Sequence, residues 1–171
     1  ALSLRRTADR ERIADLDTIP SPYLMGLFDE FGSVGAGAVI ESNRGCPYGC
    51  TFCDWGSATM SRMRKFDLQR VYDELEWCAK NKVKVIFCAD SNFGIFARDV
   101  DTARKIVELN QTYGYPKRFE SSYAKNTVKH LREIIETVNE QLGITILLVE
   151  HDMSMVMRVC DYIYVINFGS N

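Results

Sequence analysis

Runs of strand-forming residues alternate with helical patterns along most of this chain of 171 residues. Apolar runs typical of strands occupy residues 37–42, 82–90, 144–150 and 162–168, and the more polar run at 117–124 is a further predicted strand. Apolar residues at the helical spacing of three or four occupy residues 68–81, 100–114, 128–142 and 153–160. Because a helix that connects two parallel strands forms a right-handed crossover, this alternation favours a parallel sheet. We therefore predict an α/β fold built on a parallel sheet.

Residues that typically begin and end helices flank two of the helical patterns. Asp67 precedes the pattern at 68–81, and Asp99 precedes the one that ends at Gly114, so both aspartates are predicted N-caps. Gly114 is the predicted end of the second helix, because glycine readily adopts the left-handed conformation there. Residues 91–97 are predicted to form a loop.

Polar side chains stand where the predicted strands end. A segment with three cysteines follows the first strand, and Asp90 ends the second. Ser121 and Ser122 lie near the end of the third, and Glu150 and His151 end the fourth. The carboxyl ends of parallel strands share one edge of the sheet, where open α/β folds bind ligands. We therefore expect these residues to face one rim.

Charge and composition exclude some classes of partner. A formal net charge of −2 and a pI near 5.8 predict no clustered basic surface for nucleic acid. The chain has no run of about 18 apolar residues, and its first residues lack the apolar core of a signal peptide. We therefore predict a cytoplasmic protein without membrane insertion. Cytosolic thiols stay reduced, so clustered cysteines there favour metal binding or catalysis over disulfides.

Three of the cysteines, Cys46, Cys50 and Cys53, lie within the eight residues CPYGCTFC. Zinc is one interpretation, although a structural zinc site needs four ligands and no second pair or nearby histidine is present. A structural role is the second, and it suits cysteines that stand singly in predicted helices and strands. These are Cys78, Cys88 and Cys160. The third is a four-iron cluster, in which three thiolates leave one iron open to a substrate or cofactor.

The segment CPYGCTFC resembles the CxxxCxxC motif of the radical S-adenosylmethionine (SAM) enzymes, which carries an aromatic residue before its third cysteine. The likeness extends over about residues 15–126, where IPSPYLMGLFD, RVYDELEWCAK and VIFCADSNFGI resemble the cobalamin-binding branch of that superfamily. The resemblance implies a partial (βα) radical SAM-type barrel with a [4Fe-4S] cluster on Cys46, Cys50 and Cys53. SAM would bind the open iron, and an electron donor would reduce the cluster, which would cleave SAM to methionine and a 5'-deoxyadenosyl radical.

The same resemblance implies roles for four residues outside the cysteine triplet. Phe52 would lie near the adenine of SAM. Asp90 and Asn92 stand in ADSNFG, where the superfamily commonly has a Gly-Gly-Glu run, and they would accept hydrogen bonds from the SAM amino group. Ser122 would provide a further polar contact to SAM.

Two glycines and one tryptophan border the cysteines. Gly45 and Gly49 would let the backbone approach the cluster, where a side chain would collide and where N–H groups can donate to the sulfides. Trp55 would cover the cluster or pack in the core.

The sequence changes character after about residue 128. The stretch LREIIETVNEQLGITILLVEHDMSMVMRVCDYIYVINFG resembles the C-terminal part of ABC-transporter ATPase subunits, especially those of branched-chain amino acid importers. His151 matches the switch histidine of those proteins, and Glu150 and Asp152 match its flanks. No GxxxxGK[ST] phosphate loop, LSGGQ signature or Walker B pair occurs in the sequence, so we predict no ATPase activity.

The two resemblances divide the chain into three segments. Residues 1–38 are a predicted irregular entry, residues 39–127 a partial radical SAM core, and residues 128–171 an ABC-ATPase-like segment packed into the same α/β domain. The chain therefore reads as a chimera joined near 126–133, without the later barrel strands and the cobalamin domain. Three functions stay open: a radical SAM-type iron-sulfur protein, an inert α/β scaffold with an empty cysteine loop, and an ATPase fragment that binds nucleotide.

Overall fold

The computed structural model describes residue 8 and residues 11–31, 37–50, 53, 63–124, 128–142 and 152–165. Two 3-10 helices, Leu16–Thr18 and Asp29–Phe31, precede the first strand. The strands are β1 (Gly37–Ile40), β2 (Asn43–Arg44), β3 (Arg64–Lys65), β4 (Val85–Phe93) and β5 (Arg118–Tyr123). The α-helices are α2 (Leu68–Lys80), α3 (Arg98–Tyr113), α4 (Val128–Leu142) and α5 (Met153–Val159).

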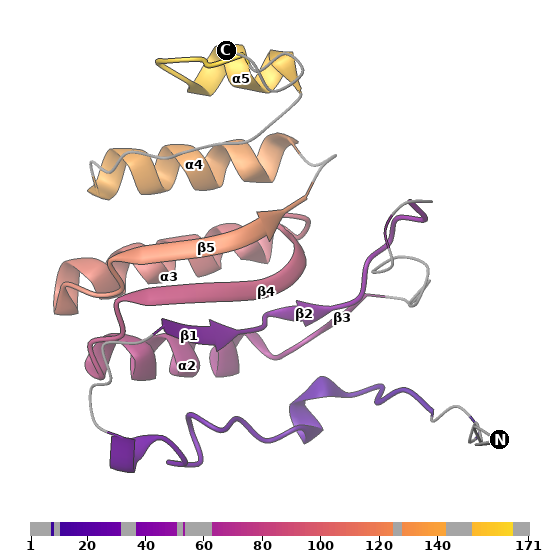
Figure 1. Ribbon diagram of the computed structural model, residues 1–171, viewed down its shortest axis with the longest axis vertical. Coiled ribbons are helices and arrows are strands. Elements are labelled where there is room, and N and C mark those ends of the chain that lie inside the picture. The colour runs from indigo at the N-terminus through magenta and orange to yellow at the C-terminus, as the bar shows by residue number, and fades with distance from the viewer. Residues whose placement is uncertain are drawn as a thin grey trace, which may run out of the picture.

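The main sheet has three parallel strands in the order β1-β4-β5 (Figure 1). Ile40 pairs with Cys88 on β4, and Cys88 pairs with Ser121 on β5. Helix α2 leads into β4 and α3 leads into β5, and both lie on one face of the sheet in Figure 1. The predicted parallel α/β architecture is confirmed for the three strands of the main sheet, whereas the partial radical SAM-type barrel stays a prediction.

The core lies between this sheet and the helices. Leu75 of α2 and Ile86 of β4 are fully buried there, at 0% exposure. Helix α2 is amphipathic, and its N-cap is Asp67, whose carboxylate accepts a hydrogen bond from the backbone N–H of Gln69 at 2.8 Å. The predicted N-cap Asp67 is therefore confirmed, and so is Gly114, which ends α3 in the left-handed conformation with φ of 74°.

The prediction that Asp99 caps the second helix is wrong, because the helix already begins at Arg98. Ala97 is the N-cap residue, and it makes no side-chain cap. The Asp99 carboxylate turns back and accepts hydrogen bonds from the backbone N–H groups of Gly94 (2.8 Å) and Phe96 (3.0 Å). These bonds tie the loop after β4 to the first turn of α3. Burial raises the pKa of Asp99 to about 6, more than these two donors lower it.

Strand β4 is longer than predicted. It continues through Ser91–Phe93, which the sequence assigned to a loop. Phe93 still pairs with Tyr123, and its carbonyl accepts from the backbone N–H of Ala124 at 2.8 Å. The neighbouring strand therefore extends β4 by hydrogen bonds that local sequence patterns do not reveal.

The C-terminal part confirms two predicted helices and corrects one strand. Helices α4 and α5 lie within the predicted ranges, and Asp152 caps α5 by accepting from the backbone N–H groups of Ser154 and Met155. The predicted strand at 144–150 lies outside the described residues. Residues 162–165, the described part of the last predicted strand, form no strand. Tyr162 and Tyr164 are 87% and 81% exposed there, and within the described residues no strand pairs with this segment.

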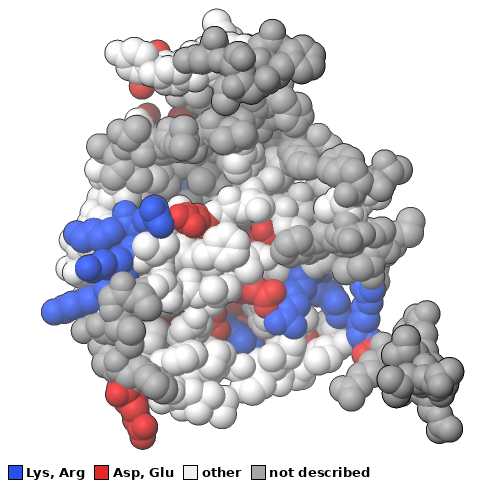
Figure 2. All heavy atoms as spheres, viewed as in Figure 1, with Lys and Arg blue, Asp and Glu red and all other residues white. Residues whose placement is uncertain are grey.

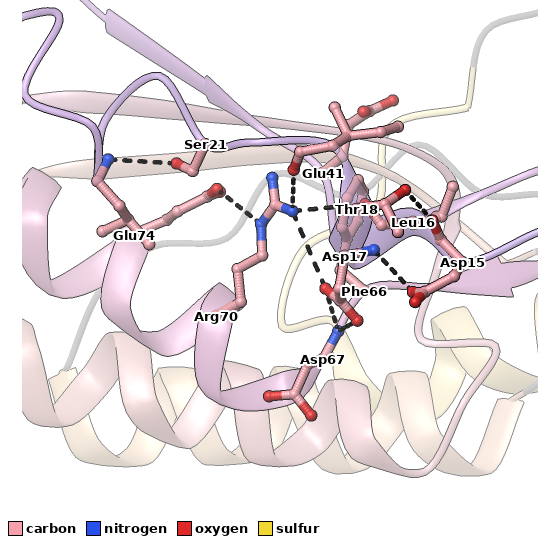
Figure 3. A network of polar contacts seen from close by, with 12 residues as sticks. Asp15, Leu16, Asp17, Thr18, Ser21, Glu41, Phe66, Asp67, Arg70 and Glu74 are labelled. Atoms are coloured by element: carbon pink, nitrogen blue, oxygen red, sulfur yellow. Dashed lines mark hydrogen bonds and ion pairs between the residues drawn. The ribbon is translucent and has the colours of Figure 1, made fainter. Parts of the chain in front are cut away.

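Arg70, in the first turn of α2, binds the segment that precedes β1 (Figure 3). Its guanidinium donates to the carbonyl of Ile19 at 2.5 Å and lies 3.9 Å from the Asp17 carboxylate. It also pairs with the buried Glu74 at 3.3 Å and stacks over the Phe66 ring. Arg70 thus helps to connect a segment with little regular structure to the core, as does the backbone N–H of Asp67, which donates to the Asp17 carboxylate at 3.0 Å. None of the described helices combines the length and the apolar character that crossing a membrane requires.

A tyrosine from the same segment covers the free edge of β1. The Tyr23 hydroxyl donates to the carbonyl of Val39 at 2.8 Å and accepts from its N–H at 3.0 Å. It therefore satisfies the two backbone groups that a neighbouring strand would otherwise bind.

Replacing Tyr23 with Phe is expected to lower the free energy of unfolding by about 1 kcal/mol, because both bonds to Val39 are lost while water reaches this edge. Urea denaturation measures the loss, and NMR hydrogen exchange should show a less protected Val39 amide. Tyr162→Phe, at a residue that is 87% exposed, is the control and should leave both unchanged. An equally protected Val39 amide in the Tyr23 variant would contradict this account.

Candidate metal centre

The cysteine segment leaves the sheet through a short ladder that closes its base. Asn43 pairs with Lys65 and Arg44 with Arg64, so β2 and β3 bring the two ends of residues 45–63 together. The backbone N–H of Phe66 continues the ladder by donating to the carbonyl of Ser42 at 3.0 Å. We call residues 45–63 the cysteine loop.

Arg98 fastens the base of the cysteine loop from α3. Its guanidinium donates to the carbonyl of Phe66 at 2.7 Å and to the carbonyl of Ser42 at 2.9 Å. These two carbonyls stand on opposite sides of the base, one before the loop and one after it. Arg98 was not predicted from the sequence, which placed it just before the helix expected at 100–114 and gave it no role.

Asp90 holds the entry to the cysteine loop. Its Oδ1 accepts from the backbone N–H groups of Ser42 (2.8 Å) and Asn43 (3.1 Å). Its Oδ2 accepts from the Asn43 side-chain amide at 2.6 Å and from the Ser42 hydroxyl. Asp90 is buried, and the burial raises its pKa although all four donors favour the carboxylate. The contact of Asp90 with SAM stays a prediction.

The next two residues of β4 extend this contact to the first cysteine. The Ser91 hydroxyl donates to the carbonyl of Gly45 at 2.5 Å. The Asn92 side-chain amide donates to Cys46 Sγ at 3.3 Å and to the Ser91 hydroxyl at 2.9 Å. Asn92 therefore lies beside Cys46, the first cysteine of the triplet, whereas its contact with the SAM amino group stays a prediction.

The three thiols are free and half-buried. Among the residues that the structure describes, no three His, Cys, Asp or Glu side chains come close enough together to hold a metal ion, so the thiols are not assembled as a ligand set. The donor set nonetheless fits an iron-sulfur cluster in kind, with three thiols in eight residues and an amide N–H on one sulfur. Gly45 adopts a φ of 111°, which favours glycine, and the position of a Cβ on Gly49 is open space.

Of the remaining predicted site residues, Ser122 alone lies within the described part of the chain. Ser122 lies in β5, where its side chain is exposed, and no described contact joins it to the cysteine loop. Phe52, Trp55, Glu150 and His151 lie outside the described residues. Their predicted roles stay predictions.

Charges of both signs lie on the described surface. On the face that Figure 2 shows, lysine and arginine side chains form groups with aspartate or glutamate among them. Beside the cysteine loop, Arg44 pairs with Glu41 at 2.5 Å. At the amino end of β5, away from the loop, Arg118 pairs with Glu120 at 2.7 Å.

The amino-acid sequence that carries this site is similar to two classes of known protein. No protein-family model matches the chain. A cobalamin-dependent radical SAM methyltransferase, TokK, from Streptomyces tokunonensis is 39% identical over 160 residues, which cover 87% of this chain and 23% of that protein. A 2-(S-pantetheinyl)-carbapenam-3-carboxylate methyltransferase from Streptantibioticus cattleyicolor matches with the same identity and coverage. The chain thus spans about a quarter of the length of these curated relatives.

A shorter match concerns a different class of protein. The methionine import ATP-binding protein MetN 1 of Yersinia pestis is 42% identical over 43 residues, or 25% of this chain and 12% of that protein. The MetN protein of Histophilus somni is 44% identical over an equally long stretch. Because the shares of 87% and 25% together exceed the whole chain, some residues match both classes. The chain is therefore similar over most of its length to cobalamin-dependent radical SAM methyltransferases and over a quarter of it to the ATP-binding subunits of methionine importers.

Proposed function

We propose that this chain is a radical SAM-type iron-sulfur segment that holds a [4Fe-4S] cluster on Cys46, Cys50 and Cys53 and binds SAM beside it. The observation that carries the proposal is the hydrogen bond from the Asn92 side-chain amide to Cys46 Sγ, the first sulfur of the cysteine motif. The curated relatives that match most of the chain are named as methyltransferases, one of them as a radical SAM methyltransferase, which supports it. A sulfur that already receives an N–H donor is suited to bind a metal as a thiolate. When bound, the cluster would supply an electron for the reductive cleavage of SAM.

The residues of the chain would orient and shield these groups. The ladder of β2 and β3 closes the base of the cysteine loop, and Arg98 ties both sides of that base to α3. Asn92 would keep its hydrogen bond to the Cys46 sulfur and stabilise negative charge there. Phe52, Asp90 and Ser122 would contact SAM, as the resemblance implies. Methyl transfer to a substrate, with cobalamin, would require the parts of the longer relatives that this chain does not span.

Anaerobic reconstitution with iron and sulfide, followed by electron paramagnetic resonance (EPR) of the reduced protein, tests the proposal. We expect a four-iron signal that changes when SAM is added. Cys50→Ala is expected to lose this signal, because only two ligands remain. Cys160→Ala is the matched control, since Cys160 is a half-buried free thiol outside the motif, and it should keep the full signal. A parent protein without a cluster, or an unchanged signal in Cys50→Ala, would refute the proposal.

A catalytically inert α/β scaffold with an empty cysteine loop is the second candidate. The observation that favours it is that the three thiols do not form a ligand set within the described residues. The same reconstitution separates the two candidates, because the scaffold would stay colourless and the partly exposed thiols of Cys46, Cys50 and Cys53 would still react with a thiol reagent. The absence of a phosphate loop from the sequence gives the nucleotide-binding alternative no comparable support.

A further inference from the structure

Three consecutive residues of β4 all bind the few residues that lead into the cysteine loop. Asp90 accepts four hydrogen bonds from Ser42 and Asn43. Ser91 then donates to the carbonyl of Gly45, and Asn92 donates to Cys46 Sγ. Successive residues of β4 thus contact successive residues of the segment 42–46.

We propose that Asp90, Ser91 and Asn92, which we call the β4 clasp, position Cys46 for metal binding by ordering residues 42–46 before any metal is bound. The consequence for metal binding rests on the proposed function. The ordering itself does not, because every bond in it is made by residues of the metal-free chain. These are positioning residues, since Asp90 and Ser91 act on the cysteine through the backbone that carries it.

Burial makes the clasp effective. Ser42, Asn43 and Asp90 are exposed by 0%, 1% and 2%, so water does not compete for their hydrogen bonds. The Asp90 carboxylate accepts and cannot donate, and all four of its partners donate to it. An asparagine in its place would turn an N–H group toward some of these donors. The clasp is therefore specific for a carboxylate and not merely for a side chain of that size.

Asn92 adds a contact to the sulfur itself. Its side chain is 3% exposed, and the same amide group donates to Ser91 and to Cys46 Sγ. A donor fixed in this way orients Cys46 and stabilises a more negative sulfur. Removing the donor should leave the Asp90 bonds intact and change the properties of a bound cluster.

The decisive experiment is NMR hydrogen exchange on the metal-free Asp90→Asn protein. We expect the amides of Ser42 and Asn43 to exchange at least about tenfold faster than in the parent, because their acceptor is weakened. After reconstitution, the same variant should bind less iron per chain. Unchanged exchange at both amides in a folded Asp90→Asn protein overturns the clasp. If the parent binds no iron, the proposed function fails, while the exchange result still decides the clasp.

Two further variants keep the test decisive if Asp90→Asn does not fold. Ser91→Ala removes the hydroxyl that donates to the Gly45 carbonyl and should move the carbonyl ¹³C resonance of Gly45 upfield, because a carbonyl that loses a hydrogen bond is more shielded. Asn92→Leu should leave exchange at Ser42 and Asn43 unchanged and lower the midpoint potential of the loaded cluster. An unchanged Gly45 carbonyl resonance in Ser91→Ala overturns the clasp, and so does an unchanged potential in Asn92→Leu.

Asn81→Leu is the matched control for these variants. Asn81 also donates one side-chain hydrogen bond, to the carbonyl of Trp77 at 2.9 Å, but it lies at the end of α2. It should lower global stability without a selective change in exchange at residues 42–46 or in iron content. If Asn81→Leu changed exchange at residues 42–46 and iron content as strongly as Asp90→Asn, both effects would follow from lower global stability, and the clasp would be overturned.

Discussion

Leu75→Ala is expected to lower the free energy of unfolding by about 3–5 kcal/mol, the largest effect of any single truncation considered for this protein. Leu75 is 0% exposed on the apolar side of α2 and belongs to the cluster that contains Ile86 of β4. Alanine would remove apolar area from the core and leave a cavity that the helix and the sheet cannot fully close. Urea denaturation followed by circular dichroism measures the loss.

Leu27→Ala is the matched control for this prediction. Leu27 is 58% exposed, so the same truncation removes little buried area, and the expected change is within about 0.5 kcal/mol. Equal losses for the two variants would mean that α2 does not form the packed interface described above. A partial loss of about 1 kcal/mol at Leu75 would indicate that the core relaxes into the cavity.

Asp99 is expected to make the protein less stable as the pH rises from 3.8 to about 6. Burial raises the pKa of Asp99 from 3.8 to about 6, so within this range the folded state holds a proton that the unfolded state releases. The stabilisation is fully present below the unfolded pKa and is lost as the pH rises through the folded one. Counting this group alone, the loss is about 3 kcal/mol, from 1.36 kcal/mol for each tenfold change in proton affinity.

Asp99→Asn tests this prediction because an amide keeps an acceptor for Gly94 and Phe96 but carries no charge. The variant is expected to lose the fall in stability between pH 4 and 6 and to be more stable than the parent at pH 7. Urea denaturation at intervals of one pH value measures both. Asp101→Asn, which removes an exposed carboxylate from the same helix, controls for the loss of a surface charge. A variant whose stability follows pH as steeply as the parent would contradict the assignment to Asp99.

The fold could be predicted from local patterns where those patterns decide the structure. Helix α2 follows from the periodicity of its apolar residues and from Asp67, which needs only the next two residues to act as an N-cap. Asp99 shows where that reasoning stops. An aspartate before an apolar pattern is a good N-cap in isolation, but here the backbone N–H groups of Gly94 and Phe96 compete for its carboxylate. The end of β4 has the same origin, since Tyr123 of another strand extends it.

In the candidate site, too, some residues could be found from the sequence and others only from the structure. Cys46, Cys50 and Cys53 are candidate ligands from their spacing, because a cluster-binding segment keeps its ligands close in sequence, and their role as ligands stays a prediction. The resemblance assigned Asn92 to the SAM amino group, whereas the contact that the structure shows, from its side-chain amide to Cys46 Sγ, was not predicted. Arg98 was missed, because its partners, the carbonyls of Ser42 and Phe66, lie 56 and 32 residues away in the chain. Backbone carbonyls have no sequence signature, so such contacts cannot be found from a pattern.

The sequence by itself determined the alternation of strands and helices from residue 37 to residue 123 and the parallel class of the main sheet, which follow from periodicity acting over one or two turns of the chain. The cysteine motif and the likeness to two groups of proteins were also evident from the sequence, because they rest on particular residues and not on their folded arrangement. Only the tertiary structure decided that Asp90 holds the loop entry, that Arg98 closes its base and that Asp99 is buried with a raised pKa. The physical reason is that each of these roles depends on hydrogen-bond partners brought together by folding and on the exclusion of water around them.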